Sequence, residues 1–192
     1  MPTRRKHTAS AVKGHRDDSD ALLTTGALQR AIFNSANFSS IATDAQGVIQ
    51  IFNVGAERML GYTAAEVMNT ITPADISDPV EVVARAQALS LEIGIPIAPG
   101  FEALVFKASR GIEDIYELTY IRKDGSRFPA IVSVTALRNA DGGIIGYLLI
   151  GTDNSARKRA EEELLKAAAR AITSWGSEMS AGVILFITSA AV

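Results

Sequence analysis

Two glycine-containing turns in the last third of the sequence restrict the fold more than any other feature. The segments "KDGS" (Lys123–Ser126) and "ADGG" (Ala140–Gly143) each separate two runs that are rich in β-branched and apolar residues. Asp-Gly between such runs is a strong signal for a β-hairpin, because glycine tolerates the positive φ that tight turns need. Three successive antiparallel strands are therefore predicted over residues 115–122, 127–137 and 144–152.

The first half of the folded region predicts a hairpin that continues into a helix. Residues 38–43 alternate as a strand, and "DAQG" (Asp44–Gly47) turns the chain into a second β-favouring run, Ile49–Phe52. Apolar residues then recur at helical spacing as far as Gly61, which is expected to end the helix. Asn53 stands at the junction, where its side-chain oxygen can cap the helix.

Further helix signals fill the middle of the chain. A short helix is predicted from Thr72, and a longer one from Asp78 with Val82, Val83 and Leu89 on its apolar face; a loop and a short helix follow. The order is thus two strands, several helices and three strands. This order predicts an α+β fold in which short helices pack on one face of a five-stranded antiparallel sheet, and it excludes a doubly wound parallel sheet.

Cysteine and histidine usage excludes several kinds of site. The chain has no Cys, which removes disulfides, thiolate nucleophiles, thiolate metal ligands and thioether-linked chromophores. Its two histidines, His7 and His15, lie in a basic leader that we expect to be disordered. A His-ligated haem, a His-based zinc site and a histidine general base are therefore not expected inside the domain.

The charge distribution argues against nucleic acid as a partner. The formal net charge is −2, and residues 27–153 carry nine Lys and Arg against fourteen Asp and Glu. Residues 1–16 carry five Lys and Arg and no acid, without the apolar run of a signal peptide. No kinase, cyclase or hydrolase motif is present, and we interpret neighbouring carboxylates such as Glu113 and Asp114 as solvated charges; no enzyme and no metal site are predicted.

Taken together, these segments resemble the PAS (sensory box) domain family. The family's first half has a hydrophobic strand, an Asn, a short helix and Gly-Tyr, as in Ile49–Phe52, Asn53, residues 56–60 and Gly61-Tyr62 here. The second half is similar too: "YIRKDGSRFP" resembles the family's charged hairpin, and "GYLLIGTDNSARKRAEEE" resembles its last strand, Asp-x-Thr/Ser junction and exit helix. The resemblance covers residues 27–165.

The resemblance implies a cytoplasmic module of bacterial signal transduction, of the kind found in two-component sensor kinases and cyclic-dinucleotide enzymes. It divides the chain into a disordered leader (1–19), a sensory domain with an N-terminal helix (20–153), an exit helix (154–173) and an apolar tail (174–192). Asp153 and Ser155 would form the signal junction. A homodimer is expected through the leading helix, with Leu28, Ile32 and Phe33, and through the outer face of residues 131–137.

A ligand pocket inside the domain would be apolar. The candidate lining residues are Met59, Val67, Met68, Ile76, Val83, Leu118, Tyr120, Val132 and Leu148. We favour the interpretation that these side chains simply fill a core, with no cofactor. The absence of Cys from the chain and of His from the domain excludes covalent flavin and His-ligated haem, whereas a non-covalent flavin remains an alternative.

Two functions follow as alternatives. The favoured one is a sensory and dimerisation module that signals through its C-terminal helix to an output domain or partner protein. The other is a stand-alone protein that binds a small molecule or a non-covalent flavin. The apolar tail has no assigned role; its fourteen-residue uncharged stretch, Met179–Val192, is short for a membrane span, so we favour a truncated or divergent end over a membrane anchor.

Overall fold

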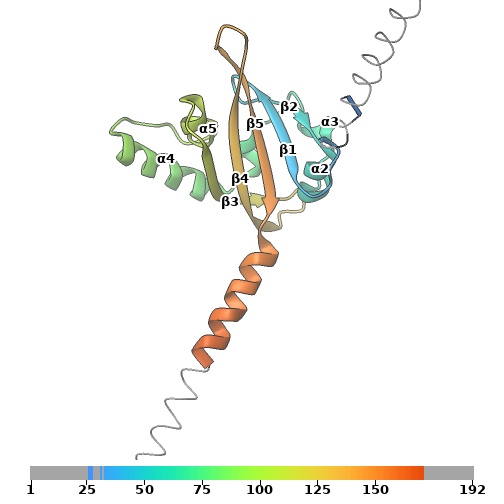
Figure 1. Cartoon of the computed structure of the whole chain (residues 1–192), viewed down its shortest axis with the longest axis vertical. Coiled ribbons are helices and arrows are strands. Elements are labelled where there is room, and N and C mark those ends of the chain that lie inside the picture. The colour runs from blue at the N-terminus through green and yellow to red at the C-terminus, as the bar shows by residue number, and fades with distance from the viewer. Residues whose placement is uncertain (1–25, 28–30, 32, 171–192) are drawn as a thin grey trace, which may run out of the picture. The chain divides into compact units, whose positions relative to one another are not determined.

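The computed structural model describes residues 26, 27, 31 and 33–170 (Figure 1). The chain divides into two compact units, with the boundary between Thr152 and Asp153. Of the expected leading helix, Phe33 is helical, whereas Leu28 and Ile32 lie outside the described residues, as do the basic leader and the apolar tail.

The first unit contains five strands and, between the second and third of them, five short or medium helical segments. In chain order the elements are β1 (Ser39–Asp44), β2 (Ile49–Phe52), α2 (Val54–Leu60), α3 (Ala64–Val67), the 3₁₀ turn η1 (Pro73–Ile76), α4 (Pro79–Ile93), α5 (Phe101–Ser109), β3 (Asp114–Ile121), β4 (Arg127–Arg138) and β5 (Ile144–Asp153). The predicted order of strands and helices is confirmed. The segment after Thr72 forms one 3₁₀ turn. The Asp75 carboxylate caps this turn by accepting a hydrogen bond from the Thr72 N–H at 2.8 Å.

The strands form one antiparallel sheet in the order β2-β1-β5-β4-β3, so the last strand lies at the centre (Figure 1). Ile41 pairs with Leu149 across β1 and β5, and Leu118 pairs with Ala130 across β3 and β4. The expected five-stranded α+β fold is confirmed.

The register of β1 and β2 contains an irregularity that the sequence pattern does not reveal. The pairing shifts between Ala42 and Thr43, so that Ile49 and Phe52 are both buried although they are three residues apart. Ile51 pairs with Ala42 and is 44% exposed. A bulge therefore turns Ile51 away from the core that its neighbours help to fill.

The hydrophobic core lies between one face of the sheet and the helices. Leu60, Val67 and Ile76 reach it from the helical side, while Ile41, Val132 and Leu149 reach it from the strands. Edge-to-face ring contacts, Tyr120 with Phe128 and Phe101 with Tyr147, add to this packing.

Asn53 is the polar centre of this unit. Its carboxamide oxygen accepts hydrogen bonds from Ala56 N–H and from Ser40 N–H, each at 2.8 Å, so it caps α2 and also binds β1. Its amide nitrogen donates to the carbonyl oxygens of Phe33, Ser35 and Phe38 at 2.8–3.3 Å. The capping role predicted for Asn53 is confirmed, and the side chain does more than cap.

The first turn of α2 lies unusually close to the segment that precedes β1. A Cβ placed on Gly55 would lie 2.0 Å from the carbonyl oxygen of Phe38. Only glycine permits this approach, which brings the three carbonyls within reach of the Asn53 amide.

We expect Asn53→Ala to lower the free energy of unfolding by at least about 3 kcal/mol, because several buried backbone groups lose their partner together. Urea unfolding followed by circular dichroism measures this loss. Asn53→Asp keeps the acceptor but points a carboxylate oxygen at carbonyls, and should be similarly destabilised. Asn37→Ala, at an exposed position, is the control; equal losses in Asn37→Ala and Asn53→Ala would contradict the role of Asn53.

Candidate functional site

The residues predicted to line an internal pocket mostly meet in the core. Val67, Ile76, Leu118, Tyr120 and Val132 are buried in one cluster. Met59 and Met68 are partly buried and pack against that cluster. The sequence therefore identified the inner face correctly at these positions, while their role in binding a ligand stays a prediction.

Val83 and Leu148 do not lie where the sequence pattern placed them. Val83 is 41% exposed, because α4 buries Val82, Ala86 and Leu89 and Val83 falls on the adjacent, outward flank. In β5 the buried apolar residues are Tyr147 and Leu149, so the alternation of the strand puts Leu148 on the opposite face. Neither residue can line a pocket on the inner face of the sheet.

The hydroxyl of Tyr120 is a polar group inside this apolar core. It is buried and has no hydrogen-bond partner among the described residues. The ring reaches from β3 to β5, since a Cβ added to Gly151 would lie 3.0 Å from Tyr120 Cε2 and 3.3 Å from its hydroxyl oxygen. Burial raises the pKa of Tyr120, so the group is a neutral phenol that can donate a hydrogen bond.

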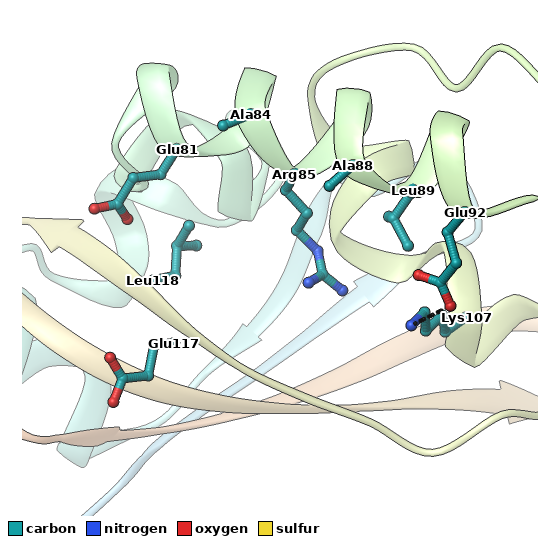
Figure 2. Close-up of a pocket in the computed structure, with 9 residues that line it drawn as sticks. All are labelled: Glu81, Ala84, Arg85, Ala88, Leu89, Glu92, Lys107, Glu117 and Leu118. Atoms are coloured by element: carbon teal, nitrogen blue, oxygen red, sulfur yellow. Dashed lines mark hydrogen bonds and ion pairs between the residues drawn. The ribbon is translucent and has the colours of Figure 1, made fainter.

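A groove of about 430 Å³ lies between α4 and β3 (Figure 2). Its lining combines small and apolar side chains with charged ones: Glu81, Ala84, Arg85, Ala88, Leu89, Glu92, Lys107, Glu117 and Leu118. Few of these positions were expected to form a site. A signal that could have drawn attention to the groove is the placement of Glu81, Arg85 and Glu92 at helical spacing along one flank of α4.

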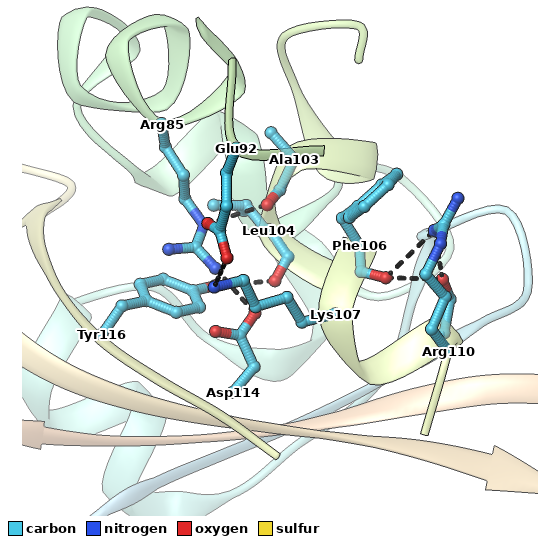
Figure 3. Close-up of polar contacts among 10 residues, drawn as sticks. Arg85, Glu92, Ala103, Leu104, Phe106, Lys107, Arg110, Asp114 and Tyr116 are labelled. Carbon is cyan, nitrogen blue, oxygen red and sulfur yellow. Dashed lines mark hydrogen bonds and ion pairs between the residues drawn. The ribbon is translucent and has the colours of Figure 1, made fainter. Parts of the chain in front are cut away.

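Arg85 joins three elements at the back of this groove (Figure 3). Its Nη2 lies 2.6 Å from Asp114 Oδ2 and its Nε donates to the Ala103 carbonyl at 2.9 Å. The guanidinium carbon stands 3.5 Å from the centre of the Tyr116 ring, and the Tyr116 hydroxyl donates to the Leu104 carbonyl at 3.0 Å. Arg85 thus holds α4, α5 and β3 together.

Asp114 corrects an expectation from the sequence. We interpreted it, with Glu113, as a solvated charge, but Asp114 is only 5% exposed and bonds to Arg85. Its position at the first residue of β3 directs the side chain under α4, while Glu113 is exposed. The guanidinium supplies the partner that a buried carboxylate needs.

The other charged side chains of the groove are also engaged within the domain. Glu81 accepts hydrogen bonds from the N–H and the hydroxyl of Thr119 at 2.6 and 2.8 Å. Lys107 Nζ lies 3.1 Å from Glu92 Oε1. These polar groups therefore serve structure first, and a ligand in the groove would meet mainly small apolar side chains.

The described residues contain no group of three His, Cys, Asp or Glu side chains that could hold a metal ion. Within the same part of the chain, helices that combine the length and hydropathy of a membrane span are absent.

The second unit contains a helix over residues 155–170. Asp153 Oδ1 accepts a hydrogen bond from the Ser155 N–H at 2.8 Å, and the Asn154 carbonyl accepts from Lys158 N–H at 3.0 Å. Asp153 therefore satisfies one of the free N–H groups at the start of the helix. Leu164 and Leu165 are strongly exposed on its surface.

Comparisons with known proteins agree on the fold. The sequence model of a family described as PAS domain matches residues 37–156. An RNA-binding light-oxygen-voltage receptor is similar in structure, with a TM-score of 0.56 and 19% identity over 88% of this chain; the match spans only 41% of that receptor. A PAS domain from Colwellia psychrerythraea has a TM-score of 0.50 and 19% identity, covering 67% of this chain and 96% of that one. No curated protein matches the sequence closely enough to count as a relative.

The start of α4, which forms one wall of the groove, should be sensitive to acid. Burial alone would raise the pKa of Asp78, but hydrogen bonds from Glu81 N–H and Val80 N–H, together with Arg127, outweigh it and lower the pKa. A carboxylate with a lowered pKa stabilises the fold above its unfolded-state pKa, and this contribution is lost as the pH falls through the folded-state value. We expect Asp78→Asn, which still caps a helix, to flatten the fall in unfolding free energy below about pH 4.

The measurement is urea unfolding at a series of pH values. Asp78→Ala removes the cap as well and should lose stability at neutral pH, unlike Asp78→Asn. An Asp78→Asn profile as steep as that of the wild type would show that Asp78 does not carry the pH dependence.

Proposed function

Because this chain belongs to the PAS domain family of sensory modules in signalling, we propose that it relays a signal through the helix over residues 155–170 to an output domain or partner protein. The observation that carries this proposal is the hydrogen bond from Ser155 N–H to Asp153. It fastens the start of the helix to the last residue of β5, the central strand of the sheet.

The bond fits a relay because it is local and modest in strength. A carboxylate beside the first N–H groups of a helix also interacts favourably with the helix dipole. A change in the strand end could therefore shift the population of the capped helix without unfolding the domain. From the membership of this chain in the family we also propose a non-catalytic, cytoplasmic role in bacterial signal transduction.

We expect Asp153→Ala to reduce hydrogen-exchange protection in residues 155–170 while the amides of β1, β4 and β5 stay as protected as in the wild type. Segment-resolved hydrogen exchange measures both regions in one experiment. Asp153→Asn keeps an acceptor and should retain most of the protection. Unchanged protection of the helix in Asp153→Ala, or a loss throughout the domain, would show that Asp153 is no junction.

We also propose a homodimer through the outer face of the sheet. Ile115 and Ile150 are exposed there, and Ile131, Leu137 and Leu148 are half-buried. Together with Ile51 they give this face apolar side chains on β2, β3, β4 and β5, a density that favours burial against a second copy.

We expect Ile150→Glu, on the central strand, to shift the protein from dimer towards monomer, because the new carboxylate would be buried without a partner. Light scattering after size exclusion gives the mass. The control is Ile112→Glu, an equally drastic change outside the strands. A wild-type protein that stays monomeric at high concentration would refute the dimer, and an Ile150→Glu dimer would refute this face as its interface.

The Tyr120 hydroxyl favours a second candidate function, the binding of a small molecule. A buried donor without a protein partner would gain a hydrogen bond from an acceptor on a ligand of largely apolar shape, including a non-covalent flavin. A visible absorption spectrum of the purified protein distinguishes a bound flavin from an unliganded core, and ligand-induced stabilisation that is lost in Tyr120→Phe would place other ligands at this hydroxyl.

A further inference from the structure

The charges of α4 lie on one flank of the helix, beside the groove between α4 and β3. Its three charged side chains are Glu81, Arg85 and Glu92. Each is bonded to another part of the domain: Glu81 to Thr119, Arg85 to Asp114 and Glu92 to Lys107. A helix that covers a domain usually carries its charges on the outward face, so α4 departs from the usual pattern.

The outward stripe of α4 consists of Val80, Ala84, Gln87 and Leu91, and it carries no charge. Val80 is 75% exposed and Leu91 87% exposed. The spacing of four, three and four residues is that of the contact seam of a coiled coil. Figure 1 shows α4 at the margin of the domain, and the exposure of Val80 and Leu91 leaves the stripe accessible to another molecule.

A groove of about 450 Å³ borders this stripe on the flank opposite the charges. Its lining is mostly apolar and uncharged: Val83, Ala86, Gln87, Ser90, Leu91, Ile97 and Pro99. Leu91 belongs to both the stripe and the groove, so a side chain that packs against Leu91 also reaches the mouth of the groove.

We infer that α4 pairs antiparallel with α4 of a second copy of this chain. A two-fold axis between Arg85 and Ala86 brings Val80 opposite Leu91 of the second copy, and Ala84 opposite Gln87. The Val80 of each copy then lies beside the Leu91 end of the apolar groove on the other copy. The two-fold axis makes this contact occur twice. The small Ala84 at the middle of the seam allows the two helices to approach closely.

Charge selects a second copy as the occupant. A charged side chain pressed onto the stripe would lose water without gaining an ionic partner, so the occupant is expected to present an uncharged face. The stripe itself is such a face, and it is self-complementary in length and in the placement of its large residues. The acidic and basic side chains beside it already have partners within their own domain.

The area of the contact indicates its strength. A seam of three helical turns buries on the order of 400 Å² per copy, about half of the ~800 Å² per partner in a standard interface. The pairing is therefore weak by itself. It becomes effective when the chains are already joined elsewhere, because the second contact then forms within one assembly. A face on α4 and a separate face on the sheet would link dimers into larger assemblies.

The decisive experiment exchanges charges across the seam. Val80→Glu and Leu91→Lys are each expected to weaken self-association at least about tenfold, since each buries a charge against an apolar side chain. In the double variant the carboxylate at position 80 meets the ammonium at position 91 of the second copy, at both ends of the seam. Self-association should return to within about threefold of the wild type.

Sedimentation velocity of the full chain over a wide concentration range gives these affinities. Each variant is measured both in the wild-type background and together with Ile150→Glu, which removes the contact proposed for the sheet. The new charges suit their places near the N- and C-terminal ends of α4, so the variants should fold, which thermal unfolding verifies. Ile112→Glu, away from α4, is the matched control and should leave the α4 contact unchanged.

The charge exchange distinguishes the possible outcomes. Positions 80 and 91 lie three turns apart on one helix, so the two charges cannot rescue each other within a chain. A double variant as weak as the single ones would refute antiparallel pairing and leave the stripe to another kind of partner. If the wild type and all variants self-associate equally, or if none of them self-associates, the α4 contact is refuted. This conclusion does not depend on what Ile150→Glu shows about the contact on the sheet.

Discussion

The carboxamide of Asn53 is the interaction on which the rest of this domain depends. One side chain binds β1 through Ser40, starts α2 through Ala56 and holds the carbonyls of the segment before β1. These groups lie in β1, in α2 and in the segment before β1, three parts of the backbone that strand pairing alone does not hold together. Asn is suited to the task because it offers an acceptor and two donors without charge, whereas Asp would offer acceptors alone.

A second polar centre lies around Arg85, in the other half of the domain. It holds α4 in place, as Asn53 holds α2. The two centres differ in chemistry, since Asn53 binds backbone groups and Arg85 binds a carboxylate, a carbonyl and an aromatic face. Both use buried polarity to fix the position of a helix against the sheet. Without Arg85, the middle of α4 would rest on the few apolar residues Val82, Ala86 and Leu89, with Glu81 and Glu92 bonded to the domain nearer its two ends.

Local sequence patterns predicted the fold well because each of its signals is local. The Asp-Gly turns, the Asn53 cap and the Gly61 stop act within a few residues, and Val132, a predicted lining residue on β4, lies on the buried face of that strand. The site was harder to predict because its partners are distant: Arg85 and Asp114 are 29 residues apart, and nothing near Asp114 in the sequence reveals that it is buried. Leu148 was misplaced because a strand with apolar residues on both faces does not show which face is inside.

The order of the strands in the sheet has a consequence for how the chain is made. The central strand, β5, is the last to be synthesised, and Ser39 meets Gly151 across 112 residues. Until β5 leaves the ribosome, β1 and β4 each present an open edge that can pair with another nascent chain. Completion of the sheet therefore waits for its final strand, and a chain interrupted before residue 144 would consist of two hairpins with unsatisfied edges, a species prone to aggregate and to be removed by proteolysis.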